Sequence, residues 1–138
     1  MDRIDKIDKI DKMEIDELTE RVIGCAYGVH NELGPGFPEK VYENALKIEL
    51  EEIPLEVQQQ FPIPVHYRNQ VVGDFYADQI VENRLVLELK AVRNLVKDHE
   101  VQLVGYLAAI GIDDGLLINF GPSVEVKRKY RQYRETRQ

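Results

Sequence analysis

Two carboxylates and an amine lie within thirteen residues of a segment that is otherwise strongly apolar. The segment reads DQIVENRLVLELK from residue 78 to residue 90, and its charged groups include Asp78, Glu88 and Lys90. Alternate side chains of a β-strand share a face, so Glu88 and Lys90 are expected to be neighbours. Hard divalent cations bind carboxylate oxygens, and Mg²⁺ is held by one or two carboxylates together with water and substrate phosphate. The residue types therefore predict a metal site.

The register of a β-hairpin decides whether these groups meet. If residues 82–84 form a three-residue loop, Val81 pairs with Leu85, and Asp78 lies directly opposite Glu88. Facing β-carbons are about 5 Å apart, and like charges at that spacing repel unless a proton or a cation lies between them. Two alternatives stay open: a two-residue loop, which breaks this register, and an exposed ion pair on an edge strand.

A third candidate acid lies at the start of a predicted helix over residues 38–53. Gly34-Pro35-Gly36 ends the preceding helix, which apolar spacing predicts over residues 16–33. Glu39 then falls in the first turn, with Tyr42 and Glu43 on the same face. Acidic residues in a first turn are favoured by the helix dipole alone, by about 0.3–1 kcal/mol. Glu39 is therefore either a site residue or an ordinary helix-start acid.

A later helix carries polar residues on one side. Asp98 is predicted to cap a helix over residues 99–110, which Gly111 closes. His99, Gln102 and Tyr106 lie at i, i+3 and i+7, so they form one polar stripe on an otherwise apolar helix. The stripe either faces solvent or contributes neutral donors to a site.

The remaining apolar segments predict strands around that helix. Residues 55–67 contain two prolines and read as an irregular edge strand, and residues 71–77 return as its partner. The nearly all-apolar residues 115–120 predict a buried strand reached by a helical crossover. On the helix over residues 38–53, the residues assigned to the core are Val41, Ala45 and Ile48.

Length and composition bound the class of protein. The chain has 138 residues, enough for one domain with a real core, and no apolar run approaches the length of a membrane span. Its start, MDRIDKIDKIDK, alternates charge with isoleucine, which excludes a secretory signal there and makes a cytoplasmic location the expectation. The single cysteine and three scattered histidines give no zinc-type spacing.

Charge is distributed unevenly along the chain. The net charge is −7, which argues against an extended phosphate-binding surface. The last twelve residues, KRKYRQYRETRQ, nevertheless hold six basic side chains and one acid, with Tyr130 and Tyr133 between them. This segment is either a strand that touches a phosphate backbone or a solvated basic tail.

The order of elements and motifs resembles the PD-(D/E)XK nuclease superfamily. The residues that carry the resemblance are Asp78, Glu88-x-Lys90 on the paired strand, and Gln102-x-x-x-Tyr106 on the following helix. Ala77 stands where the superfamily has a proline. More narrowly, the string GFPEKVY over residues 36–42 is similar to the signature of the GxxExxY protein family.

This resemblance implies an α/β (α+β) fold with a restriction-endonuclease-like core, in which helices flank a mixed central sheet. It implies three parts: a charged extension over residues 1–15, a nuclease-like domain over 16–128, and a basic tail over 129–138. It also implies a Mg²⁺- or Mn²⁺-dependent site. In that site, Asp78 and Glu88 ligate the metal, Lys90 lies beside the attacking water, Glu39 is the helix-borne acid, and Gln102 and Tyr106 form the last motif.

The functional expectation is a divalent-metal-dependent nuclease that hydrolyses phosphodiester bonds in nucleic acid, with DNA the favoured substrate and no membrane partner. The alternative is a non-catalytic binding or assembly module that keeps the fold. A third reading is a chain that acts only with a partner protein. Strandedness, endonuclease or exonuclease action, and a homodimeric state stay open on the sequence.

Overall fold

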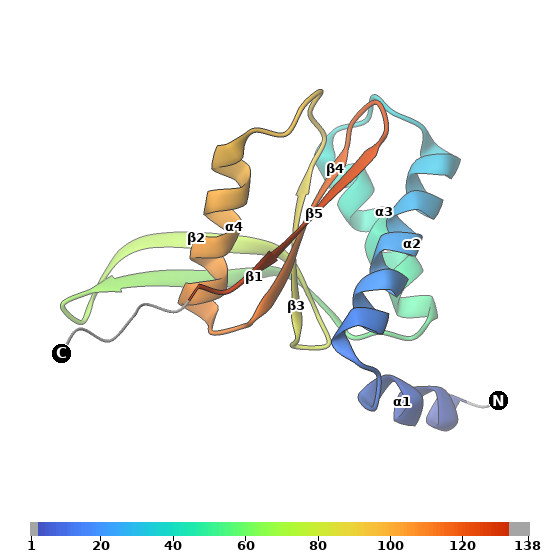
Figure 1. The fold of residues 1–138 in the computed structure, drawn as a ribbon, viewed down its shortest axis with the longest axis horizontal. Helices are drawn as coiled ribbons and strands as arrows, with labels where there is room; N and C mark the ends of the chain where they lie inside the picture. The colour runs from blue at the N-terminus through green and yellow to red at the C-terminus, as the bar shows by residue number, and fades with distance from the viewer. Residues whose placement is uncertain (1–2, 133–138) are drawn as a thin grey trace.

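The computed structural model describes residues 3–132 of the chain. Helices and strands follow one another in the order expected from the sequence, after one additional short helix at the start (Figure 1). The described helices are α1 (Arg3–Asp11), α2 (Ile15–Leu33), α3 (Glu39–Glu52) and α4 (Lys97–Ile110), and the strands are β1 (Val57–Tyr67), β2 (Gln70–Val81), β3 (Leu85–Lys90), β4 (Asp114–Phe120) and β5 (Val124–Tyr130).

The strands form one mixed sheet in the order β1-β2-β3-β4-β5. Neighbouring strands are antiparallel except β3 and β4, which run parallel and are joined through α4. A parallel pair needs such a crossover, because a short turn cannot bring the chain back to the same end of the sheet. The predicted mixed sheet and the predicted helical crossover to residues 115–120 are both confirmed.

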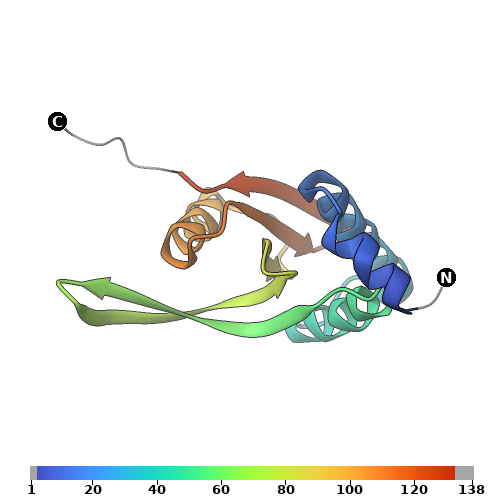
Figure 2. The ribbon, with the colours of Figure 1, turned by 90° about the horizontal axis from the view of Figure 1, so that it is seen from below.

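Helices cover both faces of this sheet (Figures 1 and 2). Leu85, Leu87 and Leu89 of β3 pack in one apolar cluster with residues of α2 and α3. Val86 belongs to a second cluster with residues of α4. Because side chains alternate along a strand, Glu88 and Lys90 share the α4 side of β3 with Val86.

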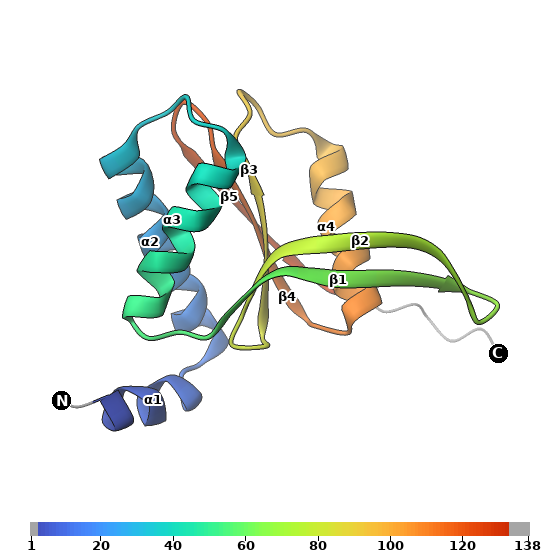
Figure 3. The same ribbon diagram turned by 180° about the vertical axis from the view of Figure 1, so that it is seen from behind.

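The predicted register of the β2–β3 hairpin is confirmed. Val81 pairs with Leu85, and both Glu82 and Asn83 in the loop have positive φ angles, 54° and 55°. At the far side, β1 is an edge strand, as its prolines require. The β1–β2 hairpin extends well beyond the rest of the sheet (Figure 3).

Two details of the helices differ from expectation. Helix α4 begins at Lys97, two residues early, and the Asp98 side chain does not cap it. Instead, Nδ1 of His99 accepts a hydrogen bond from the N–H of Val96 at 3.2 Å. In α3 the buried face is rotated from the predicted one: Val41 and Ile48 are 37% and 61% exposed, Ala45 is partly buried against the core as expected, and the buried apolar residues are Tyr42, Leu46 and Leu50.

The two ends of the described chain adjoin this core. Ile10 of α1 and Met13 are buried in the same apolar cluster as α2, although both lie in the segment that the sequence marks as a charged extension. At the other end β5 includes Lys129 and Tyr130, and residues 133–138 of the predicted tail, with Tyr133, lie outside the described residues. None of the described helices combines the length and apolar character needed to cross a membrane.

Candidate active site

The site lies where β2 and β3 separate. The two strands pair from Gln79 to Val81 on β2 and from Leu85 to Leu87 on β3. Beyond these residues β2 leaves β3, at a point called the strand split below, while β3 continues alongside β4 as far as Lys90. Beyond the split, the next residues in register are Asp78 and Glu88. Their backbone groups need partners other than the ladder, because buried N–H groups are rarely left unpaired.

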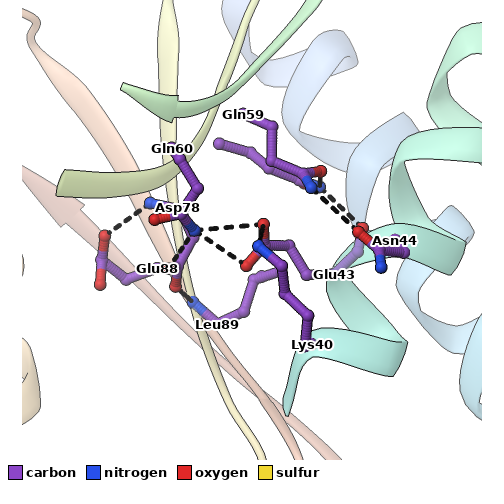
Figure 4. Close-up of polar contacts among 9 residues, drawn as sticks. Lys40, Glu43, Asn44, Gln59, Gln60, Asp78, Glu88 and Leu89 are labelled. Atoms are coloured by element: carbon purple, nitrogen blue, oxygen red, sulfur yellow. Dashed lines mark hydrogen bonds and ion pairs between the residues drawn. The ribbon is translucent and has the colours of Figure 1, made fainter. Parts of the chain in front are cut away.

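The two carboxylates supply those partners. The backbone N–H of Asp78 donates to Oε1 of Glu88 at 3.1 Å, and the N–H of Leu89 donates to Oδ2 of Asp78 at 2.7 Å. Each acid thus reaches across the split and satisfies a backbone donor of the opposite strand (Figure 4). This reciprocal arrangement holds both carboxylates at the same point between the strands.

Burial and mutual repulsion disfavour ionisation of this pair. Glu88 is only 5% exposed, and burial, followed by the nearby Asp78 charge, raises its pKa to about 8. Burial also raises the pKa of Asp78, although the hydrogen bond from Leu89 opposes the increase. Two buried acids that resist losing both protons are typical of functional sites, and a cation between such groups would remove the repulsion.

Lys90 and Glu39 complete the charged groups around the pair. Lys90 is partly buried at the end of β3, and its positive charge lowers the pKa of Glu39, Asp78 and Glu88, partly offsetting the other effects. Glu39 in the first turn of α3 has a raised pKa, first because of burial and second because of the Asp78 charge. The structure therefore brings Glu39, Asp78, Glu88 and Lys90 into one electrostatic neighbourhood.

Two residues that the sequence did not assign to the site connect α3 to it. Glu43 is 2% exposed and accepts hydrogen bonds from the amide of Gln60 at 3.1 and 3.2 Å and from Lys40 at 2.9 Å. The same Gln60 amide also donates to Oδ1 of Asp78 at 3.4 Å (Figure 4). The β1–β2 register could have revealed Gln60, because the flanking pairs Gln59–Gln79 and Phe61–Ala77 leave it across from Asp78. The role of Glu43 depends on how α3 packs on β1.

The two residues of the last predicted motif, Gln102 and Tyr106, lie in different environments. Tyr106 is 9% exposed, and burial followed by the charges of Glu88 and Asp78 raises its pKa, so it lies within electrostatic range of the acidic pair. It also packs against Phe75 at 5.8 Å between ring centroids. Gln102, one turn earlier on α4, is exposed, and its side chain makes no hydrogen bond with residues 3–132. The structure thus brings Tyr106 to the acids and leaves Gln102 at the surface.

Tyr42 orders the approach to α3. Its hydroxyl donates to the carbonyl of Gly34 at 2.6 Å and accepts the N–H of Phe37 at 3.2 Å, while its ring stacks on Phe120 at 4.8 Å. The loop between α2 and α3 is therefore fixed to the core immediately before Glu39. This tyrosine is fully buried and acts by positioning the backbone that carries the acid.

The basic residues of the C-terminal strand are engaged in ion pairs. Arg128 contacts Asp16 at 2.7 Å and Asp114 at 3.4 Å, while Lys129 contacts Glu100 at 3.2 Å. Lys127 and Arg131 likewise face Glu125 and Asp113. Along residues 127–131, each basic side chain thus faces an acid of the same domain.

The donor set fits a hard divalent cation that keeps part of its hydration shell. Among residues 3–132, no three His, Cys, Asp or Glu side chains are arranged to hold a metal ion by themselves. One or two carboxylates, water and a substrate phosphate are nevertheless the usual ligands of Mg²⁺, and the carboxylates of Asp78 and Glu88 are of the type and number that could provide the protein part of that set. The arrangement therefore suits a partly hydrated divalent cation better than a metal enclosed by protein ligands.

A comparison with protein families agrees with this geometry. A profile described as the PD-(D/E)XK nuclease superfamily matches residues 16–132. This chain belongs to that superfamily. The PD-(D/E)XK match includes the strand split, the acidic pair, Lys90 and α4, so the expected superfamily is confirmed, whereas the narrower GxxExxY assignment stays a prediction.

A solved structure has the same fold. The structure described as "Crystal structure of SSO0001" is 18% identical to this chain and aligns with a TM-score of 0.55. The alignment covers 70% of this chain and 52% of SSO0001, so this chain spans about half the length of that protein. At this identity the likeness concerns the fold alone, and it agrees with the expected restriction-endonuclease-like PD-(D/E)XK core. No curated protein matches the sequence significantly.

Proposed function

We propose that this chain is a divalent-metal-dependent nuclease that hydrolyses phosphodiester bonds in nucleic acid, with DNA as the first substrate to test. The observation that carries the proposal is the reciprocal pairing of Asp78 and Glu88 across the strand split, with Lys90 next on the same face. Membership in the nuclease superfamily supports the reaction class.

Asp78 and Glu88 would hold the cation in this proposal. A bound Mg²⁺ or Mn²⁺ polarises a phosphate oxygen and lowers the pKa of bound water. The ammonium group of Lys90 is a compact charge suited to stabilising negative charge on the reacting phosphate or to orienting the attacking water. Glu39 would bind water at the edge of the site. The Tyr106 hydroxyl is a neutral donor suited to positioning a phosphate, and Gln102 would join it only when substrate is bound.

We also propose that the chain belongs to the GxxExxY group. Gly36 has a φ angle of 106°, which favours glycine, and Tyr42 fixes the loop that precedes Glu39. These three residues are the named positions of that signature, so each has a physical reason to be there. A cytoplasmic location, expected from the sequence, also stays a prediction.

The decisive test is a nuclease assay of the purified chain with Mg²⁺ or Mn²⁺ on single-stranded and double-stranded DNA and on RNA. We expect metal-dependent cleavage that a chelator stops and that Glu88→Ala or Lys90→Ala abolishes. The folded state of each variant is checked by circular dichroism. Full cleavage by a well-folded Lys90→Ala protein would reject the catalytic assignment.

A second candidate is a non-catalytic module, either alone or with a homodimeric or different protein partner. The ion pairs along residues 127–131 and the net charge of −7 favour it, because they leave little positive surface for nucleic acid. Calorimetric titration with Mn²⁺ distinguishes the two candidates. Absence of binding near neutral pH, together with absence of cleavage, would favour the module.

A further inference from the structure

A pocket of about 370 Å³ is lined by segments that adjoin, along the chain, residues of the candidate active site. Three turns line it: residues 35–37 before α3, residues 91–93 after β3, and residues 120–122 after β4. Phe37 lies two residues before Glu39, and Ala91 directly follows Lys90, so two of its walls continue the segments that carry the charged groups of the site. Its volume is within the range of small-ligand pockets.

Hydrogen bonds from buried or partly buried side chains hold the walls in place. The Asn119 side chain accepts the N–H of Val92 at 2.9 Å and donates to the carbonyl of Val92 at 2.8 Å. His30 donates from Nε2 to the carbonyl of Gly121 at 2.8 Å. Together with the Tyr42 hydroxyl on the first turn, these bonds fix all three turns to the core. The pocket is therefore preformed, as ligand pockets usually are.

The side chains that line the pocket combine aromatic surface with positive charge. Phe37 is 46% exposed and its ring meets the buried Tyr42 edge-on at 6.2 Å between centroids. Arg93 is exposed and, unlike the cations of β5, forms no ion pair within residues 3–132. A planar guanidinium binds phosphate through two parallel hydrogen bonds, and an exposed aromatic face accepts a nucleobase by stacking.

We propose that this pocket binds one unpaired nucleotide of the substrate strand beside the scissile phosphate. Its base stacks on Phe37, and its phosphate contacts Arg93. The inference rests on the proposed nuclease function and adds the substrate class: a single strand, or a strand end that has separated from its partner. A base within a duplex is paired and stacked on both faces, so it enters such a pocket only after unstacking.

The chain has no tryptophan, which permits a direct test of binding. Phe37→Trp places a single tryptophan at the pocket. Tyr130→Trp is the control and places a single tryptophan at the end of β5. Tyr130 is 57% exposed and pairs with Asp114, at the end of β4 that lies away from the pocket. Each variant is titrated with oligothymidylate and with a duplex of equal length, in EDTA so that no cleavage occurs. We expect saturable quenching at position 37 by the single strand, weaker quenching by the duplex, and no change at position 130.

A second measurement uses side chains removed one at a time. Binding of a labelled single strand is followed by anisotropy over a range of salt concentrations. Arg93→Ala should weaken binding about tenfold and reduce the magnitude of the salt slope by about 0.7, the value for one phosphate contact on a single strand. Lys127→Ala removes a β5 cation and should leave both quantities unchanged. Phe37→Ala should weaken binding about tenfold without altering the slope, since stacking releases no counterions.

Several outcomes would overturn the inference: equal quenching by duplex and single strand, quenching at position 130 but not at position 37, no saturable quenching at all, or Arg93→Ala binding like wild type. The proposed nuclease function is judged separately by the metal-dependent cleavage assay. Cleavage without fluorescence quenching at position 37 would contradict the pocket inference and leave the nuclease proposal supported. Binding at position 37 without cleavage would contradict the catalytic proposal, and with it the placement beside a scissile phosphate, but would leave the nucleotide pocket itself supported.

Discussion

The side-chain amide of Gln60 lies between the carboxylates of Glu43 and Asp78, and it donates hydrogen bonds to both (Figure 4). The backbone of Gln60 has a φ angle of 55°, in the left-handed region that glycine and asparagine adopt more readily than other residues do. Non-glycine residues in such conformations cluster at functional sites. Gln60 therefore links the acid of α3 to the acid of the strand split.

Replacing Gln60 separates its backbone strain from its hydrogen bonds. Gln60→Gly accepts the positive φ angle and Gln60→Ala does not, so urea denaturation should show the glycine variant more stable than the alanine variant by about 1 kcal/mol. Both variants lose the amide, and both should weaken Mn²⁺ binding and cleavage because Asp78 loses a fixed donor. Equal Mn²⁺ affinity in wild type and both variants would show that Gln60 does not position Asp78.

Glu88 should make the metal-free protein less stable as pH rises. Its pKa is about 8 in the folded state and near 4.5 when unfolded, so the folded state binds more protons between these values. The free energy of unfolding should then fall from pH 5 to pH 8, by on the order of a few kcal/mol. Denaturant unfolding in the presence of a chelator measures this dependence.

Glu88→Gln is the matched control because its side chain cannot ionise. The free energy of unfolding of this variant should change much less over the same pH range. The remaining pH dependence should come from Glu39 and Asp78, because their pKa values are also raised in the folded state. Parallel pH curves for wild type and Glu88→Gln would contradict the assignment of the pH dependence to this residue.

Tyr42→Phe should destabilise the chain although it keeps the stacked ring. The variant removes the hydroxyl that bonds Gly34 and Phe37 and leaves two backbone groups without that partner, at a cost of about 1–3 kcal/mol. Thermal and urea denaturation measure the loss. Tyr27→Phe, at a residue that is 47% exposed, should leave stability unchanged. Equal stability of the two variants would remove the positioning role of Tyr42.

Gly121→Ala should also destabilise the chain. An added β-carbon would lie 2.4 Å from the backbone carbonyl of Val92, so one of the two turns must move, and we expect a cost of about 1–3 kcal/mol. Gly28→Ala provides a control of opposite sign. It lies within α2 with no atom within 4 Å of the added carbon, and should stabilise the helix by about 0.5–1 kcal/mol. A neutral Gly121→Ala would show that the turn adapts freely.

The sequence predicted that Asp78 and Glu88 meet because their placement depends on local structure. A three-residue loop fixes the hairpin register, and the register alone sets Asp78 opposite Glu88. The network of Glu43 and Gln60 was missed because it depends on contacts between segments 17 residues apart in the chain. No pattern within α3 or β1 specifies that approach.

The helices show where periodicity is ambiguous. Helix α3 carries apolar residues on both sides, so Val41 and Ile48 fit a helical period as well as Leu46 and Leu50 do. In the structure Leu46 and Leu50 are buried in the core, whereas Val41 and Ile48 are exposed. At α4 the helix begins two residues before the predicted start, and Nδ1 of His99, not the Asp98 carboxylate, accepts a backbone N–H, that of Val96. The α3 error arises from tertiary packing overriding local preference, whereas the α4 error arises from a local contact between residues three apart.

The ion pairs of β5 have a consequence for how substrate arrives. Long-range attraction to phosphate accelerates encounter when cations are unpaired, and it weakens steeply with ionic strength. Here acids of α2, α4 and β4 cancel the field of Arg128 and Lys129 before it extends into solvent. If the proposed function holds, a nucleic-acid strand would gain no attraction from β5, and the net charge of −7 would slow its approach most at low ionic strength.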